Sequence, residues 1–419
     1  MLKIFNKKIF KINLSWLIFD KFFRASTNLI LSIILARSLG PESFGILNYL
    51  LAFIFLFTSL SSLGMNPVLT NLIIKNKYKN NHVTIMNAYY IRCIFSLVNY
   101  LIFIFVINLI NKDQIYLNYS IILGSGIILK SSEVLFSYFE AKSFSKYIVL
   151  SQLVGLISSA LIIIYIISTG LEFVYIYYAL IIDIFLVFIL INIFYYIKIN
   201  SLFTKLNLLI IKAIIKKSLP VLFSTISIIL YMRIDQIMIY SMINEYSLGV
   251  YSVSVRFIEI FHFIPKIIMI SFLPFLLISK KYNLNLLKIN SIIFKLSLIV
   301  AIFIFFSSEY LITFIFGENY INSIITTKIL SFSIIFVFYG VTNEHWYVTN
   351  NLQKYYAINV FLGAITNILL NYILILNFGI EGAAYATLIT YFLIIFVFDY
   401  LNKKTRNLLI IKFKSLMKI

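Results

Sequence analysis

The sequence is poor in charge, in acids and in cysteine. Only 12% of its 419 residues are charged, whereas 62% are hydrophobic; a soluble domain is about 25% charged. This excludes a soluble enzyme, a secreted disulfide scaffold and a disordered chain. The one cysteine, Cys93, cannot form an intrachain disulfide or a cysteine-based metal site. The three histidines, His82, His262 and His345, lack metal-ligand spacing, so no metal site is expected.

Enzyme signatures are also missing. There is no glycine loop of the kind that binds phosphate, and no segment between the apolar runs exceeds roughly 20–25 residues, which leaves no room for a soluble catalytic domain. We therefore expect no catalytic residues, no cofactor and no direct use of ATP.

What the chain does have is a series of long apolar runs. A transmembrane helix needs about 20 apolar residues, and the first run is too long for a signal peptide. The sequence predicts an all-α membrane protein of twelve spans, at about 14–36, 44–65, 84–108, 118–138, 147–168, 174–196, 218–240, 248–276, 290–308, 322–348, 357–377 and 382–401. A tight turn is expected at Leu39-Gly40-Pro41, and a bend at Pro265 or Pro274.

The basic residues give the orientation. The net charge is +20, with 35 Lys and Arg against 15 Asp and Glu. In a soluble protein this charge would suggest binding to nucleic acid. Here, however, 24 of the basic residues fall in every second segment between the predicted spans, and the loops on the other side of the membrane hold only Arg37 and Lys112. Cytoplasmic segments carry the excess of Lys and Arg. We expect both termini in the cytoplasm and no nucleic-acid partner.

Several short patterns recur half a chain apart, which indicates a duplication. The matches, at offsets of 204, 208 and 209 residues, are Ser43-Phe44-Gly45 with Ser247-Leu248-Gly249, Lys146 and Gly155 with Lys354 and Gly363, and Gly170-Leu171-Glu172 with Gly379-Ile380-Glu381. Six spans per copy preserve orientation, so the predicted halves, 1–203 and 204–419, should be related by an axis along the membrane normal. Substrate sites of such transporters lie between the halves.

These segments resemble a known family. The resemblance lies in Ala36-Arg37-Ser38-Leu39-Gly40-Pro41-Glu42-Ser43-Phe44-Gly45, Arg233-Ile234-Asp235-Gln236, Leu248-Gly249-Val250-Tyr251, Asn367, Asn371-Tyr372 and Gly379-Ile380-Glu381-Gly382. Together they are similar to Wzx-type polysaccharide flippases of the multidrug/oligosaccharidyl-lipid/polysaccharide exporter superfamily. The resemblance covers essentially the whole chain and implies a MATE-like fold of twelve helices.

The resemblance also implies a function. It indicates a flippase of the bacterial inner membrane that moves undecaprenyl-pyrophosphate-linked oligosaccharide, as in O-antigen and lipopolysaccharide biosynthesis, from the cytoplasmic to the periplasmic leaflet. The implied partners are this lipid-linked oligosaccharide, membrane lipids, a polysaccharide polymerase and a chain-length regulator. The alternatives are a MATE-type drug or cation antiporter and a flippase for capsule, exopolysaccharide or lipid II precursors. The sequence leaves open the sugars and the driving force, whether proton or sodium antiport, membrane potential or product removal.

Charges inside spans mark the candidate site, because each is costly in lipid and usually faces a cavity or a partner. We expect the cations to bind the pyrophosphate, and the related flippases support the choice of Arg24 and Arg256 above the others. The acids are candidates for proton or ion coupling. The cations are Arg24, Arg256, Lys21, Arg233 and Lys130, and the acids are Asp235, Glu259, Asp183 and Glu133.

A structural alternative stays open for most of these charges. Lys21, with Asp20, can reach cytoplasmic water at the end of the first span. Arg256 with Glu259, and Lys130 with Glu133, are three residues apart and can pair along a helix. Arg233 and Asp235 are two apart and point to opposite sides, so each needs its own partner.

Overall fold

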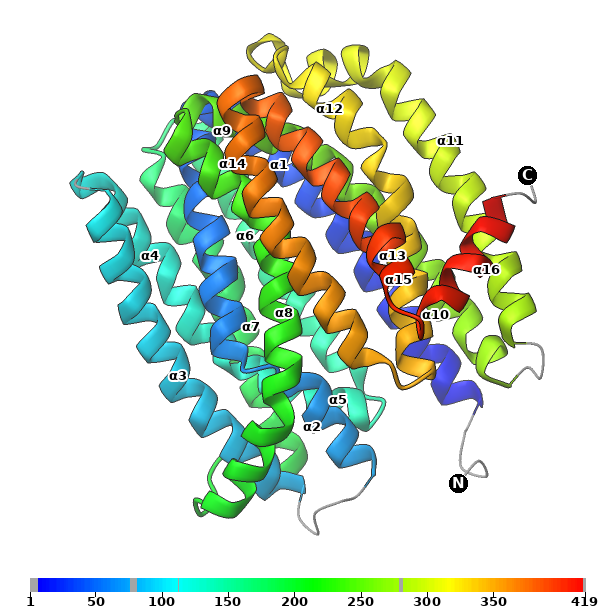
Figure 1. Ribbon diagram of the computed structural model, residues 1–419. Helices are drawn as coiled ribbons and strands as arrows, with labels where there is room; N and C mark the ends of the chain where they lie inside the picture. Colours follow the sequence, from blue (N-terminus) through cyan, green and yellow to red (C-terminus); the bar gives the residue numbers. More distant parts are fainter. Residues whose placement is uncertain (1–6, 76–80, 112, 279–281, 417–419) are drawn as a thin grey trace. The chain divides into compact units, whose positions relative to one another are not determined.

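The computed structural model describes residues 7–75, 81–111, 113–278 and 282–416, and within these ranges the chain is helical, without a strand (Figure 1). Seven cations counted in the orientation argument lie outside the described residues: Lys3, Lys77, Lys79, Lys112, Lys280, Lys281 and Lys418. The chain divides into two compact units. The first comprises residues up to Thr27 and Leu50–Ile226, and the second Asn28–Tyr49 and Ser227–Ile419.

Unit 1 is built from helices of the first half of the sequence. Its members are parts of α1 (Lys7–Ser62) and α8 (Leu208–Met242), with α2 (Met65–Ile74), α3 (Asn81–Ile110), α4 (Gln114–Leu129), the 3₁₀ turn η1 (Lys130–Leu135), α5 (Phe136–Ala141), α6 (Ser145–Thr169) and α7 (Val174–Ile199). Its apolar core includes the rings of Tyr138, Phe139 and Tyr195, which meet edge to face.

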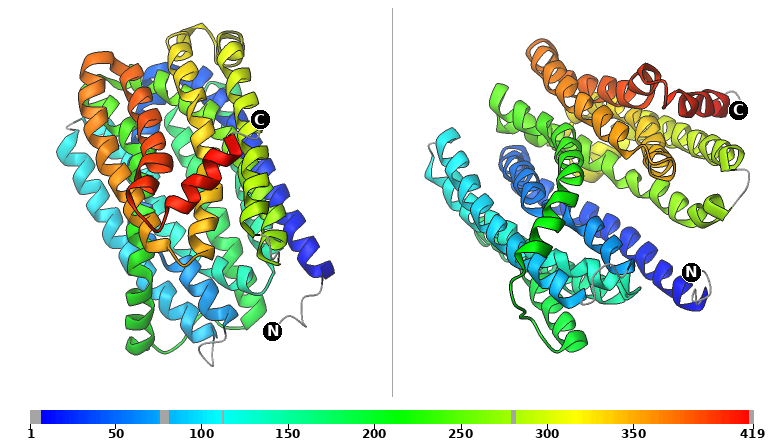
Figure 2. Two further views of the ribbon diagram at one scale, coloured as in Figure 1. Left: turned by 45° about the vertical axis from the view of Figure 1, so that its right-hand side comes forward. Right: turned by 60° about the horizontal axis from the view of Figure 1, so that its bottom comes forward.

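Unit 2 holds the rest of α1 and α8 and the helices that follow. These are α9 (Glu245–Glu259), the 3₁₀ turn η2 (Ile260–His262), α10 (Phe263–Ile278), α11 (Tyr282–Phe316), the 3₁₀ turn η3 (Glu318–Tyr320), α12 (Ser323–Ser331), α13 (Ser333–Thr349), α14 (Gln353–Phe392), the π-helical turn η4 (Leu393–Val397), α15 (Phe398–Leu401) and α16 (Arg406–Leu416). The short α16 turns back from the end of the chain's last long helix and packs on α11 (Figure 2).

Two long helices are each interrupted at a glycine. Gly40 in α1 has φ 71° and Gly379 in α14 has φ 56°, a backbone region that glycine adopts without steric penalty. The turn expected at Leu39-Gly40-Pro41 is therefore present. Before Pro265 the chain forms the 3₁₀ turn Ile260–His262, because proline has no N–H to donate to the carbonyl four residues earlier. The bend expected at Pro265 or Pro274 stays a prediction.

The helices match a membrane environment. Within the described residues nine are long and apolar enough to cross a bilayer, or ten if α12 and α13, bent by 41° from each other, form one span. Large apolar side chains lie on the outside, among them Leu209, 81% exposed, and Phe306, 77% exposed. Such exposure suits contact with lipid chains, and the protein is a multi-pass membrane protein.

The second part of α1 packs closely on the start of α9, inside unit 2. A Cβ atom on Gly45 would overlap the backbone carbonyl of Glu245, and one on Gly249 would overlap that of Pro41. The two contacts are equivalent under the 204-residue offset seen in the sequence, because Pro41 corresponds to Glu245 and Gly45 to Gly249. Glycine is required at both places, since the backbones approach too closely for any side chain.

Candidate substrate-binding clusters in the two units

In unit 2, two arginines share one carboxylate. The Nη2 atom of Arg233, on α8, lies 2.9 Å from Oε1 of Glu259, and Nη1 of Arg256 lies 3.8 Å from Oε2 of the same residue. Arg256 also donates from Nη2 to Oδ1 of Asn48 at 3.1 Å. The stronger partner of Glu259 is thus an arginine from another helix and not Arg256 on its own helix. These three side chains carry two positive charges and one negative charge.

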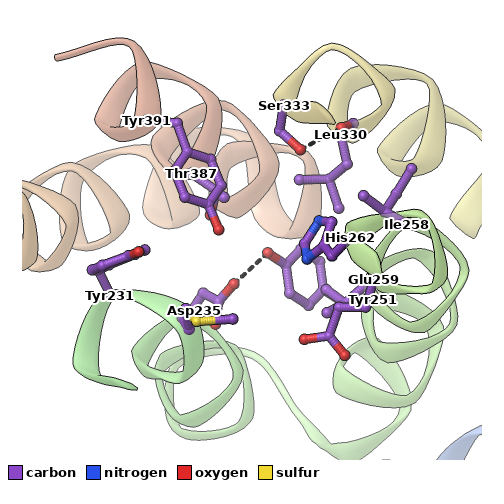
Figure 3. Close-up of a pocket in the computed structure, with 12 residues that line it drawn as sticks. Tyr231, Asp235, Tyr251, Ile258, Glu259, His262, Leu330, Ser333, Thr387 and Tyr391 are labelled. Atoms are coloured by element: carbon purple, nitrogen blue, oxygen red, sulfur yellow. Dashed lines mark hydrogen bonds between the residues drawn. The ribbon is translucent and has the colours of Figure 1, made fainter. Parts of the chain in front are cut away.

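Asp235 lies beside this cluster but has a different partner. The two-residue spacing from Arg233 predicts this, because it places the two side chains on opposite sides of the helix. Tyr251 donates its hydroxyl to Oδ2 of Asp235 at 2.5 Å, and the backbone N–H of Gln236 donates to Oδ1 at 2.8 Å. Figure 3 shows this pair in a small pocket with His262 and Tyr391 nearby. The cavity has a volume of about 30 Å³, which is enough to hold water.

Unit 1 has a comparable cluster around Asp183. This acid, on α7, packs against Gly155 of α6, where a side chain would collide with it. Arg24 of α1 and Lys130 of η1 are the two cations whose charges act on the Asp183 carboxylate. The ammonium of Lys130 lies 5.6 Å from the centre of the Phe55 ring. Among the described residues neither cation forms a salt bridge with Asp183, and the charge of Arg24 also acts on the buried Asp20.

The sequence analysis missed the most deeply buried cation of unit 1. Arg92 of α3 is 1% exposed; it donates to Oε2 of Glu133 at 2.7 Å and to Oδ1 of Asn66 at 2.8 Å. Glu133 therefore pairs with Arg92 and not with Lys130, three residues before it. The signal was present, since Arg92 lies well inside the apolar run predicted at about 84–108.

The remaining candidate, Lys21, is placed apart from Asp183. It is exposed, and its charge acts on Asp20 and Glu140. Asp20 itself is buried, with 4% exposure. Its side chain therefore does not reach cytoplasmic water, which was the structural alternative for this residue. Of the nine candidate residues, the structure thus groups Arg233, Arg256 and Glu259 in unit 2, and Arg24, Lys130 and Asp183 in unit 1.

Chemically, both clusters suit an anion. A buried arginine keeps its charge and presents several N–H donors that match carboxylate or phosphate oxygens. A carboxylate shared by two cations neutralises only part of their charge. Among the described residues, no group of three His, Cys, Asp or Glu side chains is arranged to hold a metal ion.

Comparison with known sequences gives one family. The family model described as "Polysaccharide biosynthesis protein" matches residues 11–276. A membrane protein of Methanocaldococcus jannaschii, MJ1375, described as uncharacterized, is 30% identical over 194 residues, which is 46% of this chain and 45% of that protein. The chain thus matches less than half the length of this curated relative.

Several solved structures with the same fold are distant in sequence. The lipid II flippase MurJ, in an inward closed conformation, has a TM-score of 0.75 at 15% identity over 95% of this chain and 90% of that one. An inward-facing MATE multidrug resistance transporter has a TM-score of 0.68 at 15% identity, covering 94% and 93%. A Pyrococcus furiosus transporter of the same superfamily, described as having a binding pocket of reverse polarity, has a TM-score of 0.61 at 12% identity, covering 97% and 94%. The fold is therefore MATE-like, as the sequence predicts.

Proposed function

Because this chain belongs to the polysaccharide biosynthesis protein family, we propose that it is a flippase for undecaprenyl-pyrophosphate-linked oligosaccharide. It moves an O-antigen or similar repeat unit from the cytoplasmic to the periplasmic leaflet of the bacterial inner membrane by alternating access. The protein binds and reorients its cargo and carries out no covalent chemistry. The polysaccharide polymerase and the chain-length regulator act on the cargo after its release.

The observation that carries this proposal is the surplus of positive charge inside the apolar helices. In unit 2 the carboxylate of Glu259 contacts both Arg233 and Arg256, and in unit 1 the charges of Arg24 and Lys130 both act on Asp183. An unpaired charge buried in lipid is expensive, so such a surplus needs an anion to offset it. A pyrophosphate supplies that anion, with oxygens that fit the donors of arginine.

Within this scheme Arg24 and Arg256 form the main contacts to the pyrophosphate, assisted by Arg233, Lys130 and, at the entrance, Lys21. The acids divide into two kinds. Glu133 and Glu259 each contact an arginine at 2.7 and 2.9 Å, which suits a structural or charge-balancing role. Asp235 and Asp183 are the better candidates for proton or ion coupling, because neither forms a salt bridge within 4 Å among the described residues.

The proposed architecture has twelve spans in two six-helix halves, 1–203 and 204–419, with both termini in the cytoplasm. The breaks at Gly40 and Gly379 support the count, since each divides a long helical stretch into two lengths that can each cross a bilayer; after Gly379 the second length continues through η4 and α15 to Leu401. Reporter fusions test the orientation. A fusion after Lys205 should report cytoplasm, and fusions at Glu245 and Glu318 should report periplasm; reversed results at two sites would refute it.

Drug or cation antiport is the second candidate, because MATE transporters share the fold. A cationic cargo would meet the surplus of arginine and lysine described above and would be repelled by it. The two candidates therefore differ in the sign of the charge that they require on the cargo.

Complementation of a flippase-null strain tests the proposal. Lysine at positions 24 and 256 should retain part of the surface polysaccharide, since the charge remains but the two-pronged donor geometry is lost. Alanine at both positions should abolish it at unchanged protein level. Arg37→Ala is the matched control, because Arg37 is exposed and only donates to the carbonyl of Phe314; it should display normal polymer. Full display by the double alanine variant would refute the arginine contacts.

A further inference from the structure

The C-terminal helix α16 has two chemically different faces. The side chains of Leu408, Ile411, Lys412 and Ser415 are buried, at the spacing of one helical face. The exposed face carries Arg406, Asn407, Ile410, Phe413 and Lys414. This face therefore has basic residues near both ends of the helix and apolar residues between them. A helix face in contact with water is usually polar throughout.

The buried face is fixed to unit 2 by an ion pair. Nζ of Lys412, with no exposed surface, lies 2.6 Å from Oδ2 of Asp399 and donates to the carbonyl of Ile395 at 2.5 Å, in the π-helical turn η4. The other oxygen of Asp399 accepts from Asn359 at 3.0 Å and from Tyr347. These contacts hold α16 against the bundle and cancel the charge of Lys412.

The exposed face is positively charged only. Arg406 and Lys414 on α16 are exposed, as are Lys403 and Lys404 just before it, and the sequence has no Asp or Glu after Asp399. Between these cations, Ile410 and Phe413 are each 49% exposed. Basic and apolar side chains side by side on an exposed helical face are typical of a helix that lies at a membrane interface.

We propose that the exposed face of α16 binds the anionic headgroups of phospholipids in the surrounding bilayer, with Ile410 and Phe413 between the acyl chains. Charge complementarity selects anionic over zwitterionic lipid, and each basic residue near the surface strengthens the preference by roughly fivefold. The Lys412–Asp399 pair keeps the helix at a fixed place on the bundle, so that the bound lipids are held next to α11 and α15. This inference does not depend on the identity of the cargo.

Quenching by brominated lipids tests the proposal on the full chain in proteoliposomes. The reporter is Phe413→Trp, with the signal of the parent protein, which contains two tryptophans, subtracted. At equal mole fraction, brominated phosphatidylglycerol should quench the reporter more than brominated phosphatidylcholine. Replacing Lys403, Lys404, Arg406 and Lys414 by glutamine should reduce this preference by at least tenfold. High salt should weaken it in the parent, because exposed charges are screened.

A matched control removes the same number of charges from unit 1. Glutamine at Lys198, Lys205, Lys212 and Lys216, all exposed, should leave the lipid preference at the reporter within twofold. Equal quenching by the two lipids, or an unchanged preference in the α16 variant, would overturn the proposal. The outcome is separate from polysaccharide display, so failure here would leave the proposed flippase activity standing.

Discussion

Breaking the ion pair that anchors α16 should destabilise unit 2 strongly. Lys412 is fully buried and Asp399 is 1% exposed, so a change at one of them leaves the other as a buried charge with an incomplete set of partners. Removing one member of a buried pair costs about 3–5 kcal/mol, whereas replacing both together is often nearly neutral. We expect Lys412→Met and Asp399→Asn each to lower stability by about 3–5 kcal/mol, and the double variant to recover most of the loss.

The assay is thermal unfolding of the purified protein in one detergent, read by intrinsic fluorescence. At 2–4 °C per kcal/mol for a unit of this size, each single variant should lower the apparent Tm by about 6–20 °C. The double variant should lie much closer to the parent. Lys414→Met, two residues further along on the exposed face, is the control and should change little. If both single variants match the parent, or if the losses simply add, the pair does not anchor the helix.

Three further predictions concern the packing and the buried polar groups. Gly249→Ala should destabilise the protein by about 1–3 kcal/mol and impair polysaccharide display, because its Cβ would overlap the carbonyl of Pro41; Gly340→Ala, which meets only a flexible side-chain atom at 3.7 Å, should be tolerated, and equal effects would contradict the contact. Arg92→Met should lower the apparent Tm, by about 1.5–3 kcal/mol of stability, since Glu133 loses its charged hydrogen bond but stays partly exposed to solvent; an unchanged Tm would show that the pair is not stabilising. Asp235→Asn should reduce display and alter its dependence on external pH while the protein stays in the membrane, and normal display between mildly acidic and mildly basic medium would exclude carboxylate coupling at this position.

The helices themselves were largely predictable from the sequence. The runs expected at about 84–108, 147–168 and 174–196 correspond to Asn81–Ile110, Ser145–Thr169 and Val174–Ile199. An apolar run reports the part of a helix that lies in lipid, and polar residues can extend the helix beyond it. For this reason α8 begins at Leu208, ten residues before the start expected at about 218.

The pairing of charges was much less predictable. Spacing along one helix suggested Lys130 with Glu133, but the carboxylate of Glu133 contacts Arg92 of another helix at 2.7 Å. Which faces of two helices meet depends on side-chain packing between segments distant in sequence, and local periodicity does not contain that information. The same holds for Lys412, which reads in the sequence as one more cytoplasmic cation and in the structure is buried against Asp399.

The central claim is that the protein transfers an anionic, lipid-linked oligosaccharide across the bilayer. The direct measurement uses proteoliposomes with polyprenyl-pyrophosphate oligosaccharide and a glycosidase that cannot cross the membrane. Active protein should make sugars from the inner leaflet accessible to the enzyme, so digestion should pass the plateau reached in protein-free vesicles. The variant with alanine at Arg24 and Arg256 should stay at that plateau. No digestion beyond the plateau by the parent protein, together with uptake of a fluorescent organic cation by the same vesicles, would contradict the account.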